Sequence, residues 1–375
     1  MSKVRAMDRN VARSEVLKAS AELVERGLVV RTWGNISCRL DDKRFVITPS
    51  GIGYDRLTPE MIVVVDMDTL RHEGGVKPSS EKGIHAAAYK SNREANFVIH
   101  THQTYAACIS VAGFAGLGPA PDEKAELGGE IMLAGYGLPG TKKLKKNVAK
   151  ELNKNSSAIL MEKHGVLITG KDRETAFRRA VLLEDICHRA MSSPGFSDFS
   201  DGSPDGISCL VSDDELLYTA NGSQKTYALN GSDLPFPLRI HAALLSSNPA
   251  AKILVHRATE TCAALPGIKK LPAILDDFAQ MVGNDAKCVP SDSVFGIVKA
   301  LKKRNGALVR ELGAVCYAGD ESDAAALLTL MEKNALAFLH ASRYGKVPVL
   351  SLPDRKLMRI VYLKKYSKRQ FISEV

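Results

Sequence analysis

The chain alternates short apolar runs with longer segments in which apolar residues recur at helical spacing. The first such segment, MSKVRAMDRNVARSEVLKASAELVERG, carries charges throughout and predicts an amphipathic helix. It lacks the apolar centre of a secretory signal, so we expect a cytoplasmic protein. Further along, the run FVIHTHQTYAACIS (97–110) places an apolar strand before a polar turn.

The same pattern occurs twice. Residues 83–102, GIHAAAYKSNREANFVIHTH, match residues 239–258, RIHAALLSSNPAAKILVHRA, at a constant offset of 156. A second match, between 158–177 and 307–326, has an offset of 148, so the second copy is eight residues shorter in between. Each matched pair predicts a strand, a turn and a helix. Identities at a constant offset indicate a duplication, and we expect two tandem α/β domains.

A polar stretch separates the two copies. The segment SSPGFSDFSDGSPDG is dominated by Ser, Pro, Gly and Asp, which sustain neither helix nor strand. A chain of 375 residues also suits two domains better than one. We therefore predict a catalytic domain at 1–191, a linker at 192–206 and a degenerate domain at 207–375.

Three histidines of the first copy have the spacing of metal ligands. His100 and His102 lie two residues apart in a strand-like run, so both imidazoles project to the same side. His164 follows another apolar strand, in MEKHGVLITG. An HxH pair alone is more often structural than metal-binding. Three neutral imidazoles, however, suit Zn²⁺ and leave an open position for substrate.

Glu81, in KPSSEKGIH, directly precedes a helical pattern. It is a candidate fourth ligand that substrate displaces, or a general base that this displacement frees. A carboxylate in the first turn of a helix capped by Ser79 or Ser80 explains the same residues. The second copy favours a shared chemical role, because it has lost the counterparts of Glu81, His102 and His164 together. Pro237 aligns with Glu81, Ala258 with His102 and Leu312 with His164.

Three small polar turns occur in the first copy: WGNIS (33–37), TPSGIG (48–53) and KPSSE (77–81). Their backbone N–H groups, amide and hydroxyls can together bind a phosphate. The residues that offer these groups are Gly34, Asn35, Ser50, Gly51, Ser79 and Ser80.

Composition narrows the class of partner. The net charge of +9 favours anions, but no basic motif is interleaved with aromatic residues, so nucleic acid is disfavoured. No apolar stretch approaches the roughly 20 residues that span a bilayer, and we expect no membrane partner. The seven cysteines are scattered and form no CxxC pair, which predicts reduced thiols.

Between residues 10 and 190 the motifs GN-S, TPSG, PSSE, HTH, GT-K-L and HG occur in the order and spacing of the class II aldolase/adducin family, which the first copy therefore resembles. The resemblance implies the fold class α/β, with two tandem class II aldolase-like domains. Each would have a central, mainly antiparallel β-sheet flanked by helices in three layers.

The resemblance also implies a mechanism. Zn²⁺ would be held by His100, His102 and His164, with Mn²⁺, Co²⁺ or Fe²⁺ as alternatives, and Glu81 would deprotonate the carbon beside the ketone. The predicted reaction is that of a lyase: retro-aldol cleavage of a small phosphorylated ketose to dihydroxyacetone phosphate and an aldehyde, through an enediolate stabilised by the metal. A sugar-phosphate epimerase, dehydratase or decarboxylase of the same superfamily is the alternative.

The second copy resembles the family less completely, over residues 234–342, and we expect it to lack the metal site. Its stretch LPAILDDFAQMVGNDAKCVP looks like the loop that reaches a neighbouring subunit's site in family tetramers. Asp276 or Asp277 is therefore a candidate inter-domain contribution. The resemblance implies a homo-oligomer, either a dimer of tandem chains or a tetramer.

Two other interpretations compete. The segment 130–162 contains G-x-G-x-x-G between a strand-like run and a basic helix, as in nicotinamide-binding folds. However, the alternating strands of a doubly wound sheet do not follow it, and Pro139 sits where pyrophosphate would approach. The other interpretation is a non-catalytic scaffold like adducin, and the complete ligand set of the first copy argues against it.

Overall fold

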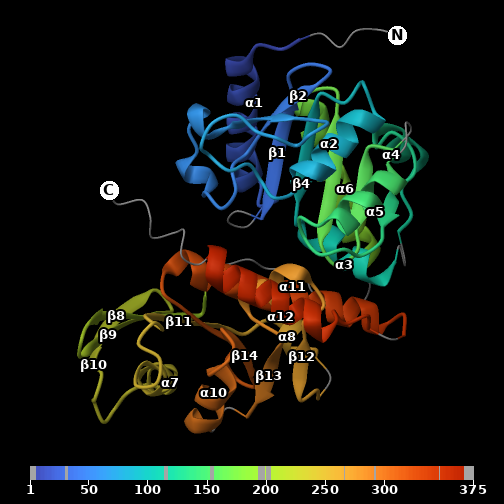
Figure 1. The fold of residues 1–375 in the computed structure, drawn as a ribbon. Helices are drawn as coiled ribbons and strands as arrows, with labels where there is room; N and C mark the ends of the chain where they lie inside the picture. Colours follow the sequence, from blue (N-terminus) through green and yellow to red (C-terminus); the bar gives the residue numbers. More distant parts are fainter. Residues whose placement is uncertain are drawn as a thin grey trace. The chain divides into compact units, whose positions relative to one another are not determined.

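A computed structural model gives the fold of the chain (Figure 1). It describes residues 6–29, 33–113, 117–152, 156–192, 199, 204–265, 267–290, 293–345 and 347–366. The chain divides into two compact units: Met1–Ser193 with Leu363–Val375, and Pro194–Tyr362. Of the predicted linker at 192–206, residues 193–198 and 200–203 lie outside the described residues.

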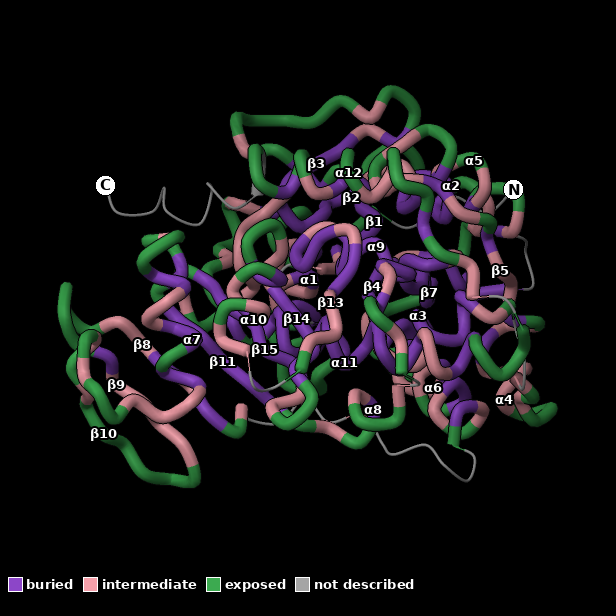
Figure 2. The backbone as a smooth tube through the Cα atoms, turned by 90° about the horizontal axis from the view of Figure 1, so that it is seen from below, coloured by how far each residue is buried: buried purple, intermediate pink, exposed green. Residues whose placement is uncertain are grey.

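The first unit is built on a mainly antiparallel sheet. Within its described residues the sheet has seven strands, in the order β3-β2-β1-β4-β7-β6-β5. These are β1 (Gly34–Arg39), β2 (Arg44–Ile47), β3 (Val63–Asp66), β4 (Phe97–Thr101), β5 (Met132–Ala134), β6 (Ala158–Met161) and β7 (Gly165–Gly170). Only the β5–β6 pair among them is parallel. Every residue of the adjacent strands β4 and β7 is buried (Figure 2).

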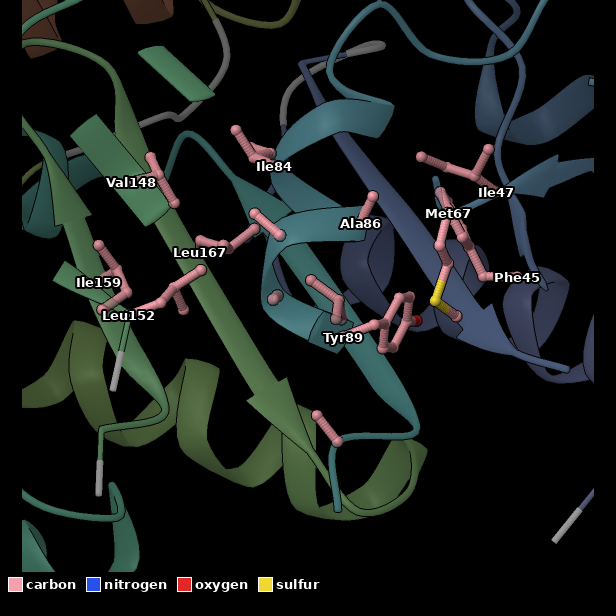
Figure 3. Packing of buried hydrophobic residues seen from close by; sticks show 14 of the residues in the cluster. Phe45, Ile47, Met67, Ile84, Ala86, Tyr89, Val148, Leu152, Ile159 and Leu167 are labelled. Carbon is pink, nitrogen blue, oxygen red and sulfur yellow. The ribbon is translucent and has the colours of Figure 1, made fainter. Parts of the chain in front are cut away.

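Helices cover both faces of this sheet. They are α1 (Arg9–Glu25), α2 (Lys82–Ser91), α3 (Thr104–Ala112), α4 (Pro121–Glu126), α5 (Lys142–Glu151) and α6 (Arg173–Met191), with short 3₁₀ turns at Tyr54–Arg56 and Pro59–Met61. Helices α2 and α5 pack on one face over a core that includes Tyr89, Val148 and Leu167 (Figure 3). Helices α1, α3 and α6 pack on the other. Successive side chains of a strand point to opposite faces of the sheet, so the same strands contribute apolar residues to the core on each face.

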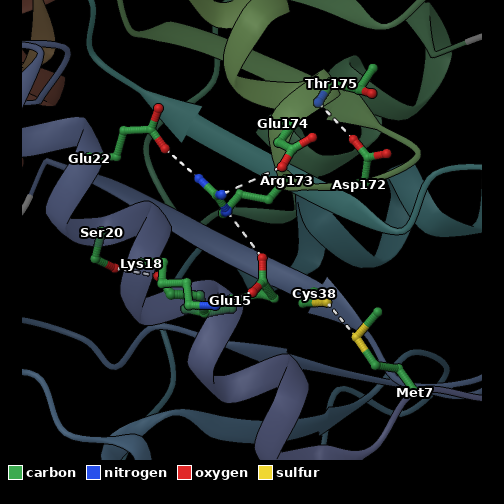
Figure 4. Close-up of polar contacts among 11 residues, drawn as sticks. Met7, Glu15, Lys18, Ser20, Glu22, Cys38, Asp172, Arg173, Glu174 and Thr175 are labelled. Carbon is green, nitrogen blue, oxygen red and sulfur yellow. Dashed lines mark hydrogen bonds and ion pairs between the residues drawn. The ribbon is translucent and has the colours of Figure 1, made fainter.

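Polar contacts fix the N-terminal helix in place (Figure 4). Asp8 begins α1 by accepting the N–H groups of Asn10 and Val11, as N-cap residues do. Arg173, at the start of α6, donates to Glu15 at 3.1 Å and to Glu22 at 2.5 Å. One guanidinium therefore ties α1 to α6.

The second unit repeats this plan. Its described strands are β8 (Gly206–Ser212), β9 (Glu215–Ala220), β10 (Ser223–Ala228), β11 (Ile253–Arg257), β12 (Lys270–Pro272), β13 (Asp285–Val289), β14 (Gly306–Val309) and β15 (Gly313–Ala318). They form a sheet in the order β10-β9-β8-β11-β15-β14-β13-β12. Leaving out the edge strand β12, this order matches that of the first sheet strand for strand.

The helices of the second unit also cover both faces of its sheet. They are α7 (Phe236–Leu245), α8 (Glu260–Ala263), α9 (Asp276–Met281), α10 (Val294–Leu301), α11 (Glu321–Ser342) and α12 (Leu352–Val361). A π-helical turn at Tyr362–Tyr366 follows, and all of it except Tyr362 belongs to the first unit. Helices α7 and α10 pack on one core and α11 lies against β11 and β15. The predicted fold class of two tandem, helix-flanked and mainly antiparallel domains is confirmed. Among the described residues, no helix combines the length and apolar character needed to cross a bilayer.

Candidate metal centre

Adjacent strands of the first sheet position the three predicted histidines. His100 lies on β4, where it is opposite Asn35 of β1 and Leu167 of β7. His102 follows one residue after β4 ends, and His164 ends the turn between β6 and β7. Leu167 belongs to the core under α2, so His100 faces the same helix. The centroids of the three imidazole rings lie 4.5–5.0 Å apart.

Gly165 allows the two strand ends to come this close. A Cβ at this position would overlap the carbonyl oxygen of Thr101 and approach the Cα of His102 to 3.1 Å. Gly313 of the second unit has the same relation to the carbonyl oxygen of Arg257. The close approach therefore belongs to the fold of both units, but only the first unit has His102 and His164 beside it, where the second has Ala258 and Leu312.

This geometry predicts the effect of Gly165→Ala. The added methyl group meets backbone, which cannot swing away, so β4 and β7 must separate locally at a cost of about 1–3 kcal/mol. We expect a lower melting temperature and weaker metal binding. The control is Gly313→Ala, which meets backbone in the same way, is strained further by its φ of 69°, and should lower stability without changing metal binding. Isothermal titration with Zn²⁺ measures the difference, and equal affinity in the two variants would contradict it.

Hydrogen bonding orients His100. Its Nδ1 lies 2.7 Å from the carbonyl oxygen of Val166, which can only accept, so Nδ1 carries the proton. An imidazole that binds a metal is neutral, and in that form the lone pair of His100 is on Nε2, which lies 3.1 Å from Nε2 of His164. The two rings are stacked with an interplanar angle of 9°. A backbone partner that fixes the free nitrogen is typical of metal-binding histidines.

Glu81 completes the cluster from the start of α2. Its Oε2 lies 3.0 Å from Nε2 of His100 and its Oε1 lies 3.1 Å from Nε2 of His164. Burial, which leaves the residue 8% exposed, raises the pKa of the Glu81 carboxyl. The positive charge of the two imidazoles outweighs burial and holds the pKa well below its usual value.

The cluster has the dimensions of a metal site. Four ligand atoms, one each from Glu81, His100, His102 and His164, all lie within 4.8 Å of one another. In a tetrahedral zinc site with bonds near 2.0–2.1 Å, neighbouring ligand nitrogens are about 3.3 Å apart. The 3.1 Å between the nitrogens of His100 and His164 is close to this value. The residues therefore fit a single small cation.

The predicted phosphate-binding turns lie beside Glu81. Thr48, in the turn at 48–53, contacts the other two turns. Its hydroxyl accepts the N–H of Ile36 and its carbonyl accepts the N–H of Ser79. Ser50 joins them by donating its N–H to the carbonyl of Lys77. Gly34 and Asn35 open β1, Gly51 has a positive φ of 75°, and Ser80 is exposed.

Two details of these turns differ from the sequence interpretation. Glu81 is itself the N-cap of α2, and the Ser79 hydroxyl accepts its N–H at 3.2 Å instead of capping the helix. The Asn35 side chain donates to Glu81 at 3.1 Å, so part of its hydrogen-bonding capacity is already used. Sequence reasoning also missed the hydrogen bonds behind Asn35: its side chain contacts His85, and Ser37 contacts both His85 and Tyr89. The available signal was that His85 aligns with His241 at the offset of 156, so both copies keep this histidine.

The second unit fills the corresponding position differently. Its His256 matches His100, and its Gly206 occupies the register of Asn35. The hydroxyl of Tyr218 lies 3.0 Å from Nε2 of His256. A side chain at Gly206 would overlap both groups, so this contact requires glycine. The inward nitrogen of His256 is therefore occupied by protein.

The two predicted aspartates of the second unit open α9. Asp277 accepts a hydrogen bond from the ammonium of Lys333 at 2.8 Å, and both side chains are buried. A buried carboxylate is stabilised by such a partner. The contribution of Asp276 or Asp277 to the reaction stays a prediction.

Comparisons with known proteins agree with this geometry. The class II aldolase and adducin N-terminal domain matches residues 14–191 and 206–339. An L-fuculose phosphate aldolase from Escherichia coli O6:H1 (strain CFT073) is 33% identical over 196 residues, which is 51% of this chain and 88% of that protein. An L-ribulose-5-phosphate 4-epimerase, UlaF, from Salmonella paratyphi C (strain RKS4594) is 32% identical over 198 residues, which is 49% of this chain and 86% of that protein.

Among solved structures, the L-fuculose-1-phosphate aldolase from Thermus thermophilus is similar with a TM-score of 0.41 and 23% identity, over 51% of this chain and 99% of that one. The family match extends over both units and well over half of the chain. The protein therefore belongs to the class II aldolase and adducin N-terminal domain family.

Proposed function

We propose that the first unit catalyses metal-dependent retro-aldol cleavage of a small phosphorylated ketose, releasing dihydroxyacetone phosphate and an aldehyde. The observation that carries the proposal is the buried carboxylate of Glu81, within 3.1 Å of two imidazole nitrogens that have the spacing of ligands to one cation. The 33% identity to an L-fuculose phosphate aldolase supports this reaction class.

His100, His102 and His164 would hold the metal, and Zn²⁺ suits three imidazoles best. Mn²⁺, Co²⁺ and Fe²⁺ are alternatives for the same donors. When bound, the cation supplies a Lewis acid that polarises the substrate carbonyl. The backbone carbonyl of Val166 fixes which nitrogen of His100 faces the site.

Glu81 would carry the proton. In the direction of cleavage its carboxylate takes up the proton that the substrate hydroxyl loses as the C–C bond breaks, and then gives this proton to the carbon beside the ketone; in the direction of synthesis it removes the proton from that carbon. Its lowered pKa keeps it ionised at neutral pH, so the resting group is a base. Its place at the start of α2 sets it between the histidines and the predicted phosphate-binding turns.

The phosphate would be bound by these turns. Exposed Ser80 and half-buried Ser50 and Gly51 offer hydroxyl and backbone donors at the N-terminus of α2, where anions are favoured. Ser79 and the remaining amide hydrogen of Asn35 complete the donor set. Homo-oligomerisation and a cytoplasmic location stay predictions.

Epimerisation of a sugar phosphate is the second candidate, because the chain is 32% identical to an L-ribulose-5-phosphate 4-epimerase over nearly the same length. The two reactions give different products. An aldolase releases two fragments, whereas an epimerase returns one isomeric sugar phosphate.

One experiment tests both candidates. Zn²⁺-loaded protein is incubated with a panel of ketose 1-phosphates, and release of dihydroxyacetone phosphate is measured with a coupled dehydrogenase. We expect release from at least one sugar, and none with Glu81→Gln. A pentulose 5-phosphate that is converted to its 4-epimer, seen by NMR, without release of any fragment would favour the second candidate. No conversion by protein that holds metal would contradict both.

A further inference from the structure

A line of hydrogen bonds runs from the core of the first unit to Glu81. The hydroxyls of Tyr89 and Ser37 are 2.7 Å apart, and the Ser37 hydroxyl lies 2.7 Å from Nδ1 of His85. Nε2 of His85 lies 2.5 Å from Oδ1 of Asn35, whose Nδ2 lies 3.1 Å from Oε2 of Glu81. All five residues are buried.

Only one direction of donation satisfies every contact. Asn35 presents its Nδ2, which can only donate, to Glu81, and its oxygen, which can only accept, to His85. Nε2 of His85 therefore donates. Burial, followed by the charge of His100, lowers the pKa of His85 to about 3, so the ring is neutral and Nδ1 accepts from Ser37. Ser37 in turn accepts from Tyr89.

We propose that Asn35 and His85 are positioning residues, through which a one-way relay from Tyr89 fixes the orientation of Glu81. The inference rests on the proposed role of Glu81 at the metal. Asn35 donates to the same oxygen, Oε2, that lies 3.0 Å from Nε2 of His100. Because His85 fixes the amide of Asn35, the donor cannot rotate away from the carboxylate.

The second unit contains the relay without its last link. Ser208 lies 2.7 Å from Nδ1 of His241, as Ser37 does from His85. Nε2 of His241, however, donates to the carbonyl of Ala251 at 2.7 Å. Gly206 stands where the first unit has Asn35. The Ser–His pair alone is thus a structural feature of the fold, and its connection to a carboxylate occurs in the first unit.

The tautomer of His85 is the first test. Long-range ¹H–¹⁵N spectra of histidine-labelled, metal-free protein distinguish Nε2–H from Nδ1–H, and a His85→Phe spectrum assigns the signal. The relay requires Nε2–H on a neutral ring between pH 6 and 8. An Nδ1–H tautomer, or a ring that titrates in this range, would overturn it.

Zn²⁺ affinity, measured by chelator competition, is the second test. Loss of an outer-shell partner typically weakens metal binding about 10–100-fold, and we expect a loss of this size in Asn35→Ala. Ser37→Ala and His85→Phe should show a smaller loss that disappears in the Asn35→Ala background, because they act through Asn35. Ser208→Ala and His241→Phe are the matched controls and should leave the affinity unchanged.

The outcomes separate the relay from the proposed function. Wild-type protein that binds no Zn²⁺ would remove the proposed function, and the positioning role with it. Wild-type protein that binds Zn²⁺ no more tightly than Asn35→Ala would overturn the relay alone. Additive losses in the double variant would also overturn it, because they would show that His85 acts independently of Asn35. Ser37→Ala removes a single hydroxyl, so it serves if His85→Phe fails to fold.

Discussion

Replacing His164 with Ala is expected to strip the metal from the protein and abolish activity. Nε2 of His164 lies 3.1 Å from Nε2 of His100 and 3.1 Å from Oε1 of Glu81, so its removal opens one side of the cluster. Two imidazoles remain, and Glu81 cannot complete the three protein ligands of a catalytic zinc site while it also carries the proton. The affinity should fall by more than the roughly 10–100-fold expected for loss of an outer-shell partner. Elemental analysis after dialysis against a chelator measures the retained metal.

His102→Ala should behave in the same way, because His102 supplies another ligand atom of the cluster. The second unit provides the control. His256 matches His100 in the sheet, but its inward nitrogen contacts Tyr218. His256→Ala should therefore leave the metal content unchanged. Metal retained after loss of either His102 or His164 would contradict the assignment of the site.

The sequence predicted the architecture well, because duplication leaves a trace that does not depend on local propensity. His100 and His256 are 156 residues apart and occupy the same position in the two sheets, opposite β1 and β8. Gly165 and Gly313, 148 residues apart, both begin the strand that pairs with that position. A constant offset reports an aligned fold even where most side chains have changed.

The sequence also predicted which residues form the cluster, but it did not predict the hydrogen bonds between them. Glu81 and His100 are far apart in the chain, yet their side chains are 3.0 Å apart. The interpretation of Asn35 was incomplete for the same reason. A turn containing Asn suggests a phosphate donor, and only the pairing of β1 with β4 shows that its amide faces Glu81.

In the second unit the sequence showed which metal ligands are absent, but not which contacts take their place. The sequence revealed which groups were missing, because Ala258 and Leu312 cannot bind a metal. It did not reveal what replaced them. The contact between Tyr218 and His256 depends on a hairpin, β8–β9, whose register brings Tyr218 opposite Ser208. Register of this kind is set by the whole sheet, so a single strand sequence does not contain it.

Exchanging Glu81 for Gln is expected to stop proton transfer, while the three histidines still hold the metal when Zn²⁺ is supplied in excess. The three histidines are intact, and Gln keeps an oxygen that can accept from Nδ2 of Asn35. An amide cannot take up a proton at neutral pH, so the turnover number should fall by the roughly 10²–10⁴-fold that general acid–base catalysis contributes. Turnover at saturating substrate and metal content, measured on the same preparation, separate the two effects.

The matched control is another carboxylate close to the cluster in sequence. Glu162 lies two residues before His164, accepts the N–H of Tyr136 at 3.0 Å and pairs with Lys163 at 3.1 Å. Glu162→Gln removes a negative charge near the site without altering the cluster, so turnover should change by less than about tenfold, as for a partly exposed ion pair. If Glu81→Gln and Glu162→Gln reduced turnover equally, Glu81 would act only through its charge. A fully active, metal-loaded Glu81→Gln enzyme would remove Glu81 from the reaction altogether.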